Sequence, residues 1–224
     1  MDICTPAEFF SPTSVRRAIL STNEDSFITG PSGAGYGRIN GMSAKELEAY
    51  SDLTAKTMLE TGMTTMTLLN NPTNIFTREI YAKKLGYFAR YDNINGGIIQ
   101  MDQYRYSAGG GEVYFANDKA FVSVRLSLWH PSGESEQVTH QWLEEQAAFV
   151  NNFPADIHSI NGYSVINVHP WTVKPDSLAY FISQLDDGTE VLPADEFVLA
   201  VAKNIPHKYA KPYRNKAEIA NSEQ

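Results

Sequence analysis

Residues 43–70 constrain the fold more than any other stretch, because they mark both ends of a helix and lead directly into a strand. Ser43 and Glu46 have the spacing of a capping box, in which the serine accepts from first-turn amides and the glutamate reaches back. Gly62 stands where a helix is expected to stop, and the apolar run MTTMTLLN follows at once. A marked helix that leads into a buried strand is typical of α/β proteins.

The same alternation continues along the chain. Core strands are expected at Phe27–Gly30, Met63–Asn70, Ile98–Tyr104, Phe121–Trp129 and Val165–Val168, short strands at 112–117 and 189–192, and helices at 43–61, 77–86, 134–153, 175–185 and 193–204. Strands that alternate with helices form mostly parallel sheets with right-handed crossovers. We therefore predict an α/β fold with flanking helices, an incomplete or open (β/α) barrel, since a complete barrel typically needs ~250 residues. Residues 1–204 are expected to form one domain and the polar residues 205–224 a flexible tail.

Composition limits the classes of partner. The net charge of −8 disfavours nucleic acid, whose phosphates require a basic surface. No apolar run reaches the ~18 residues of a membrane-spanning helix, so no membrane partner is expected. The single cysteine, Cys4, excludes an internal disulfide. The first residues, MDICTPAEFF, lack the apolar core of a signal peptide, so the compartment stays open, with an extracellular or periplasmic one if the natural start lies upstream.

The stretch GPSGAGYG, residues 30–37, raises the question of what approaches its backbone so closely. A P-loop is excluded, because Tyr36 stands where its lysine must be. A dinucleotide fingerprint is excluded as well, because Arg38 occupies the place of its third glycine. Two interpretations remain: a tight loop packed against its own protein, or a loop beside a ligand with Tyr36 pointing into a cleft shared with later strand ends.

Two residues that follow predicted strands are the candidate catalytic groups. The carboxyl ends of parallel strands meet at one edge of a sheet, and Asp102 and His169 are expected there. Asp102 is the carboxylate best placed for acid–base or nucleophilic work, although an aspartate at a strand end also caps backbone amides. An ion pair between Asp102 and Arg125, a cation inside an apolar strand, is a further expectation, structural or catalytic.

Aromatic and polar residues near the same strand ends are the candidate binding groups. Tryptophan and tyrosine rings offer sugars a flat apolar surface, although most tryptophan area in proteins serves the core. We predict substrate contacts from five residues: Tyr36, Tyr104, Arg125, Trp129 and Trp171. Four further histidines show no spacing suited to a shared metal, and neither a metal nor another cofactor is predicted: His130, His140, His158 and His207.

Four segments carry a family resemblance. In order they are SFITGPSGAGYG (26–37), KAFVSVRLSLW (119–129), YSVINVHPW (163–171) and EVLPADEFVLAVAKN (190–204). Together they resemble the C-terminal domain of the family named for its GxGYxYP motif, a group of putative glycoside hydrolases. The motif departs after Tyr36, because Arg38 and Ile39 stand around the place of its Tyr-Pro. The upstream Asp-Gly-Asp-Asn-like acidic motif of full-length members does not occur in this sequence.

The resemblance implies a protein that acts on or binds an oligosaccharide or polysaccharide. One alternative is a glycoside hydrolase, with Asp102 and His169 as its catalytic groups. The other is a carbohydrate-binding or scaffolding module that has lost catalysis together with the acidic motif. In either case a partner chain or a missing N-terminal segment is expected to complete the barrel. A hydrolase with Ser32 as nucleophile is a weaker third reading, because Ala34 fills the last glycine of the G-x-S-x-G pattern.

Overall fold

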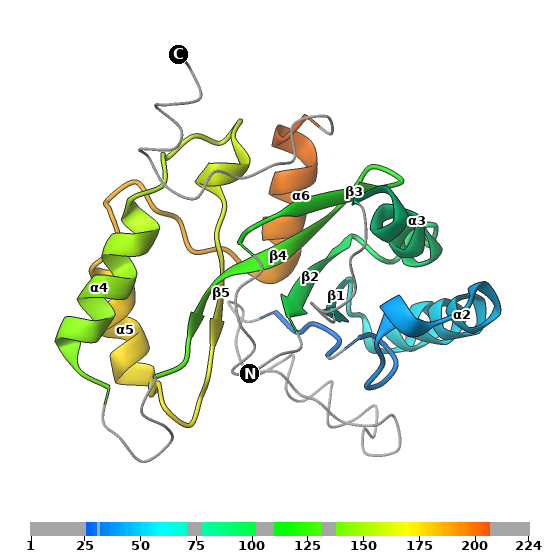
Figure 1. Ribbon diagram of the computed structural model, residues 1–224, viewed down its shortest axis with the longest axis horizontal. Coiled ribbons are helices and arrows are strands. Elements are labelled where there is room, and N and C mark those ends of the chain that lie inside the picture. The colour runs from blue at the N-terminus through cyan, green and yellow to red at the C-terminus, as the bar shows by residue number, and fades with distance from the viewer. Residues whose placement is uncertain (1–25, 31, 71–77, 102–109, 131–137, 207–224) are drawn as a thin grey trace.

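The protein has a mostly parallel, open sheet. The computed structural model describes residues 26–30, 32–70, 78–101, 110–130 and 138–206. The strands of the sheet are β1 (Thr65–Asn70), β2 (Gly96–Met101), β3 (Val113–Ala116), β4 (Lys119–Leu128) and β5 (Val165–Val168) (Figure 1). β1, β2 and β4 lie side by side in parallel, and β3 runs antiparallel to the first half of β4. β5 pairs in parallel with the second half of β4. The predicted α/β fold is therefore confirmed, in its open form.

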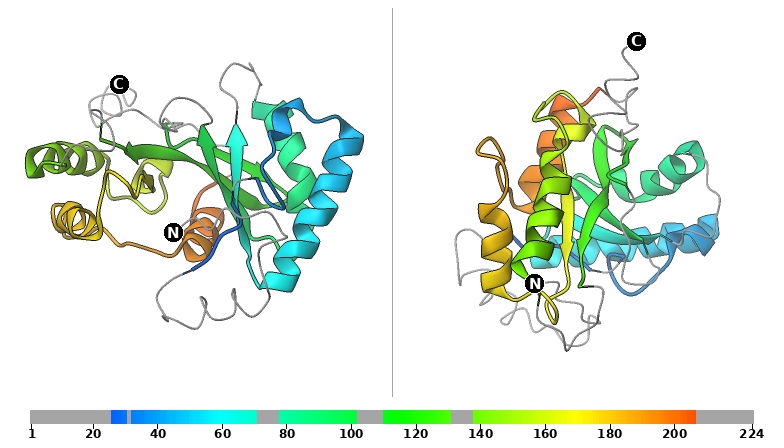
Figure 2. Two further views of the ribbon diagram at one scale, coloured as in Figure 1. Left: turned by 90° about the horizontal axis from the view of Figure 1, so that it is seen from below. Right: turned by 60° about the vertical axis from the view of Figure 1, so that its left-hand side comes forward.

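Helices cover both faces of the sheet. They are α2 (Ala44–Thr61), α3 (Arg78–Ala89), α4 (His140–Asn151), α5 (Pro175–Ser183) and α6 (Ala194–Asn204), with 3-10 turns η1 (Ile39–Gly41) and η3 (Ile160–Gly162). α2 and α3 share a core cluster with Ile99 of β2, whereas Val198 of α6 packs against Ile98. Because successive strand residues point to opposite faces, these helices lie on opposite sides of the sheet. α4 and α5 lie together over the second half of β4 and β5, at the other end from α2 and α3 (Figure 2).

The marked helix forms as its sequence predicts. The Ser43 hydroxyl accepts from the Glu46 amide, and the Glu46 carboxylate accepts from the Ser43 amide at 2.7 Å, which completes the capping box. Gly62 ends α2 in the left-handed region with a φ of 73°. Met58 and Leu47 are buried on the sheet side of the helix, so packing adds to the two end signals.

Three predicted elements differ from the structure. Phe27–Gly30 forms only an isolated parallel bridge, Thr29 to Met66, because the chain leaves the edge of β1 immediately afterwards. α3 continues through Gly86, where a stop was predicted, since the buried Leu85 and Phe88 hold the turn on both sides. Residues 189–192 form no strand, and their Val191 is exposed instead of packed. Two parts of predicted elements lie outside the described residues: the end of the strand Ile98–Tyr104, at 102–104, and the start of the helix 134–153, at 134–137.

Candidate functional site

The two outermost parallel strands on one side of the sheet end in aromatic and histidine residues. β4 is followed by Trp129 and His130, and β5 is followed by His169. The His169 amide donates to the Leu128 carbonyl at 3.1 Å, so the pairing of the two strands continues into this segment. As predicted from the sequence, parallel pairing brings Trp129 and His169 to the same carboxyl edge.

Three rings form what we call the aromatic cluster: Trp129, His169 and Trp171. The His169 imidazole stacks on the Trp129 indole with ring centroids 3.6 Å apart and an angle of 10° between planes. Trp171 meets the same imidazole edge-on, at 5.4 Å and 83°. His169 is 9% exposed, whereas Trp171 is 63% exposed. The cluster thus places an exposed indole directly against a buried imidazole.

Hydrogen bonds fix the histidine from behind. The Thr172 hydroxyl lies 3.1 Å from His169 Nδ1 and accepts from the His130 amide at 3.4 Å. The amides of Thr172 and Val173 both donate to the His169 carbonyl, at 3.2 and 2.9 Å. His130 itself is buried edge-on against Trp142 of α4. Thr172 and His130 were missed as site residues in the sequence, although Thr172 stands three positions after His169, the spacing at which a threonine reaches back to the chain.

Arg125 lies deeper in the protein than the cluster. It sits at an irregularity of the β4–β5 register and is only 3% exposed. Its guanidinium packs 4.1 Å from the Phe153 ring centre and donates to the Ile160 carbonyl at 2.9 Å. A Cβ on Gly111 would come within 2.7 Å of the same group, so the loop backbone covers it closely. Burial lowers the pKa of Arg125 to about 10.

The described residues satisfy only part of the Arg125 guanidinium. Of the residues described, only Ile160 gives it a hydrogen bond, and its Nε and Nη1 atoms are buried with no partner among them. These contacts are with Phe153, which follows α4, and with Ile160 of η3. The predicted partner Asp102 lies outside the described residues, and so does Tyr104, so the proposed ion pair stays a prediction.

The glycine stretch lies beside β1, on the other side of the sheet from β5 and the aromatic cluster. The Ser32 amide donates to the Thr67 carbonyl at 2.8 Å, and its buried hydroxyl accepts from the Leu69 amide at 2.9 Å. Arg38 returns to β1 in a second bridge, with Leu69. The residues between leave the sheet edge and lie on α2, where the Thr54 hydroxyl accepts from the Ala34 amide at 3.2 Å. The chain therefore pairs with the edge strand β1 before and after the loop, and the loop itself packs on α2.

Close packing on α2 accounts for two of its glycines. Gly33 has a φ of +83°, and a Cβ there would lie 2.5 Å from the Thr54 side chain. A Cβ on Gly37 would lie 3.0 Å from the hydroxyl of Tyr50, which also donates to the Gly35 carbonyl. What approaches this backbone is the protein's own helix. Of the two interpretations of the stretch, the structure supports the packed loop.

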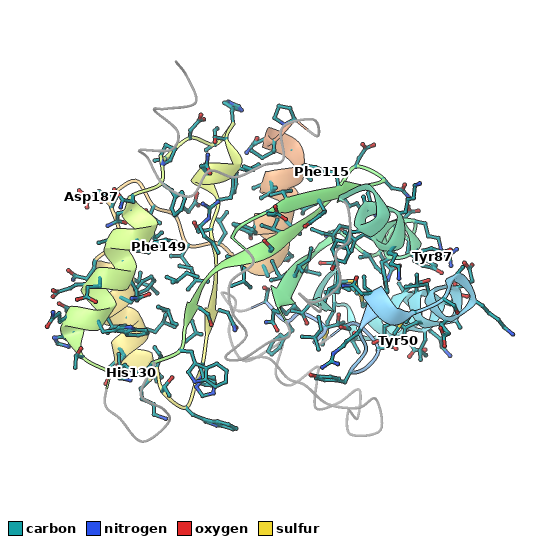
Figure 3. All side chains as sticks on the ribbon, viewed as in Figure 1. Tyr50, Tyr87, Phe115, His130, Phe149 and Asp187 are labelled. Carbon is teal, nitrogen blue, oxygen red and sulfur yellow. The ribbon has the colours of Figure 1, made fainter. Side chains whose placement is uncertain are left out.

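Tyr36 projects from this loop and is 64% exposed. The loop borders β1, whereas His169 follows β5, and β2 and β4 lie between these two strands. Strands in a sheet are spaced about 4.8 Å apart, so the sheet order does not bring Tyr36 beside His169. Figure 3 shows the same separation, with Tyr50 of α2 and His130 after β4 toward opposite sides of the molecule.

The described part of the chain contains neither a cluster of metal ligands nor a membrane-spanning helix. No group of three or more histidine, cysteine, aspartate or glutamate side chains in residues 26–30, 32–70, 78–101, 110–130 and 138–206 could hold a metal ion. Within the same residues, none of the helices has the length and apolar character required to cross a membrane.

An open parallel sheet with its aromatic cluster at the carboxyl edge defines an α/β domain of the kind that carries sites at strand ends. Residues 14–202 match the family model described as the GxGYxYP putative glycoside hydrolase C-terminal domain, and the chain belongs to this family. The resemblance seen in the sequence is thereby confirmed.

A solved structure supports the fold. The chain is similar to a putative hydrolase from Bacteroides thetaiotaomicron VPI-5482, with a TM-score of 0.73 and 25% sequence identity. The match covers 87% of this chain and 36% of that one, so this chain spans about a third of the length of the solved protein. The comparison with curated proteins finds no match.

Proposed function

We propose that the aromatic cluster binds the sugar rings of an oligosaccharide or polysaccharide and that the domain belongs to a glycoside hydrolase. The observation that carries the proposal is the 63% exposed Trp171 beside the buried His169. One face of a pyranose ring consists of C–H groups, which pack on an electron-rich indole face. The half-buried Trp129 stacks on the His169 imidazole and holds that ring in place beside Trp171. Membership of a family described as putative glycoside hydrolases supports the same class of ligand.

Hydrolysis needs an acid and a base or nucleophile, usually two carboxylates. We propose Asp102 as one carboxylate, because it follows β2 directly in the sequence and β2 pairs with β4. His169 is proposed to exchange protons with the substrate or with that carboxylate. The ends of β2, β4 and β5 point to one edge, which supports placing these two groups in the same reaction.

A non-catalytic carbohydrate-binding module is the second candidate. It is favoured by the exposure of Trp171, since a binding surface requires only the indole and needs no acid. The two candidates differ in what they predict for substrate. A hydrolase cleaves at least one member of an oligosaccharide panel, whereas the module binds a member and leaves it intact.

The binding experiment uses two matched variants, Trp171→Ala and Tyr36→Ala. Both rings are almost equally exposed, at 63% and 64%, and they occupy opposite ends of the sheet edge. Titration calorimetry with oligosaccharides of several linkages is expected to show that Trp171→Ala weakens binding by about tenfold or more. Tyr36→Ala is expected to leave the affinity unchanged. An equal loss of affinity in the two variants would show that Tyr36 also contacts the sugar. A wild type that binds none of the oligosaccharides would contradict the carbohydrate proposal.

The catalytic experiment uses Asp102→Asn, which removes the charge with little change in volume. Hydrolysis is expected to fall by orders of magnitude while binding in the same titration persists. Product release is followed by chromatography of the oligosaccharide digests. A variant that cleaves as fast as wild type excludes Asp102 from the reaction. A wild type that binds and never cleaves decides in favour of the binding module.

A further inference from the structure

An apolar groove runs along α2, on the side of the helix where the glycine loop packs. Its volume is about 390 Å³, and five described residues line it: Met42, Glu46, Ala49, Tyr50 and Leu53. Residues three, four and seven positions apart share one face of a helix, so the four lining residues that belong to α2 form one continuous stripe. We call this feature the α2 groove.

Contacts within the protein hold the groove in shape. The Tyr50 hydroxyl donates to the Gly35 carbonyl, which ties the glycine loop to the helix. A Cβ on Gly37 would lie 2.9 Å from the Met42 side chain and 3.0 Å from the Tyr50 hydroxyl, so the loop backbone packs directly against two lining residues. Tyr36, between these two glycines, is 64% exposed. The groove is therefore preformed, with an exposed aromatic ring next to it.

The lining is open to water, which favours a polypeptide over a small molecule. Leu53 is 53% exposed. Sites for small molecules enclose most of their ligand, which a half-exposed lining does not do. A single exposed leucine is ordinary on a protein surface, but a hollowed apolar stripe along a helix is how grooves receive the anchoring side chains of another segment.

Charge separates a basic partner from a second copy of this chain. Glu46 is the charged residue among those that line the groove, and Lys45, its neighbour in the sequence, does not line it. Hydrogen bonds with Ser43 lower the pKa of the Glu46 carboxyl, which is therefore ionised at neutral pH. The other carboxylates of α2 are paired with cations: Glu60 with Lys56, and Glu48 and Asp52 with Arg90. The chain as a whole carries a net charge of −8, so a second copy is repelled and a basic segment attracted.

We infer that the α2 groove docks a polypeptide segment that presents an aliphatic side chain to Met42 and Leu53 and a lysine or arginine to Glu46. The similar solved structure supports this kind of occupant. The match covers only 36% of that chain, so the same fold occurs there together with further polypeptide. The inference concerns the β1 side of the sheet and does not depend on carbohydrate binding at the aromatic cluster.

The test follows the methyl group of Met42 by NMR in the whole chain, labelled with carbon-13 at its methionine methyls, and Met42→Leu identifies the signal. The probes are two synthetic amphipathic peptides of equal length, one of leucine and lysine and one of leucine and glutamate. We expect the leucine–lysine peptide to shift the Met42 signal until it saturates. We also expect it to bind about tenfold or more tightly than the leucine–glutamate peptide.

Three variants locate the binding. Leu53→Ser is expected to weaken binding of the leucine–lysine peptide by about tenfold or more. Leu59→Ser is the matched control and should leave the affinity unchanged, because Leu59 is 70% exposed on the same helix and does not line the groove. Glu46→Gln removes the charge and keeps the capping box, which accepts glutamine, so it should bring the affinities for the two peptides closer together.

Four results would overturn the inference. They are a Met42 signal that neither peptide shifts, an equal loss of affinity in Leu53→Ser and Leu59→Ser, equal binding of the two peptides by wild type, and a Met42 signal that moves with protein concentration alone. The last of these would identify a second copy as the occupant. Should Leu53→Ser fail to fold by its amide spectrum, the Met42 shift and the comparison of the two peptides on wild type still decide.

Discussion

The two ends of the sheet edge both present an exposed aromatic ring, and they differ in what lies beneath it. Under Tyr36, glycines and hydroxyls of the loop fit against α2 and β1, and each contact has a packing explanation. Under Trp171 lie the buried imidazole of His169 and the hydroxyl of Thr172. Burying such polar groups costs free energy that apolar residues would not. Both ends bury hydroxyl groups, so the comparison teaches that the unusual backbone of the loop has a packing explanation, whereas the buried imidazole of His169 is what indicates a site.

The largest expected effect comes from His169→Gln. If the cluster is catalytic, hydrolysis of the oligosaccharide bound by wild type should fall roughly 10²–10⁴-fold, the usual contribution of a general acid or base. Steady-state rates measured on the purified variant give the result. The control is His140→Gln, because His140 also stacks on an aromatic ring, Tyr180, at 3.9 Å and 13°, yet lies on the exposed side of α4. Similar rates in both variants would remove His169 from the mechanism.

The next largest effect is on stability, at the other end of the edge. Gly33→Ala places a methyl group 2.5 Å from Thr54 on a residue with a φ of +83°, so overpacking and backbone strain add. We expect a loss of about 2–4 kcal/mol in the free energy of unfolding, measured by urea denaturation. Gly35→Ala is the matched control, because no atom lies within 4 Å of its added Cβ.

The same pair of glycine variants also tests the separation of the two regions. In the folded protein, Gly33→Ala should leave the oligosaccharide affinity as in wild type, because its contacts are with α2 and not with the aromatic cluster. A loss of stability as large in Gly35→Ala as in Gly33→Ala contradicts the packing explanation. A loss of affinity without a loss of stability would instead place the loop in the binding site.

The smallest effect is a dependence on alkaline pH. Burial raises the pKa of Tyr50 to about 12, above its ordinary value of 10.0. Between these values the unfolded chain gives up the phenol proton while the folded chain keeps it, so stability falls as the pH rises through this range. Tyr50→Phe should lessen the fall measured by urea denaturation across it, relative to wild type. Equal slopes would show that this phenol near the glycine loop is not what makes the protein sensitive there.

Local patterns in the sequence determined the α/β class and most element positions. The capping box at Ser43 and the stop at Gly62 form because they depend only on neighbouring residues. Val165–Val168 is a strand over the predicted residues, since apolar β-branched side chains favour it locally. The expectation that His169 and Trp129 share an edge also followed from sequence, because parallel strands all end on one side.

Strand order and long-range packing, by contrast, were decided by the tertiary structure. No local pattern tells which strand neighbours which, so the distance between Tyr36 and His169 required the sheet order. The reason for Gly33 appears only when Thr54, 21 positions later, lies against it. Thr172 can reach His169 locally, three positions away, but it becomes a partner of His130 only after β4 and β5 pair. Contacts between residues distant in sequence depend on the whole arrangement of the core, and the chain acquires that arrangement only as it folds.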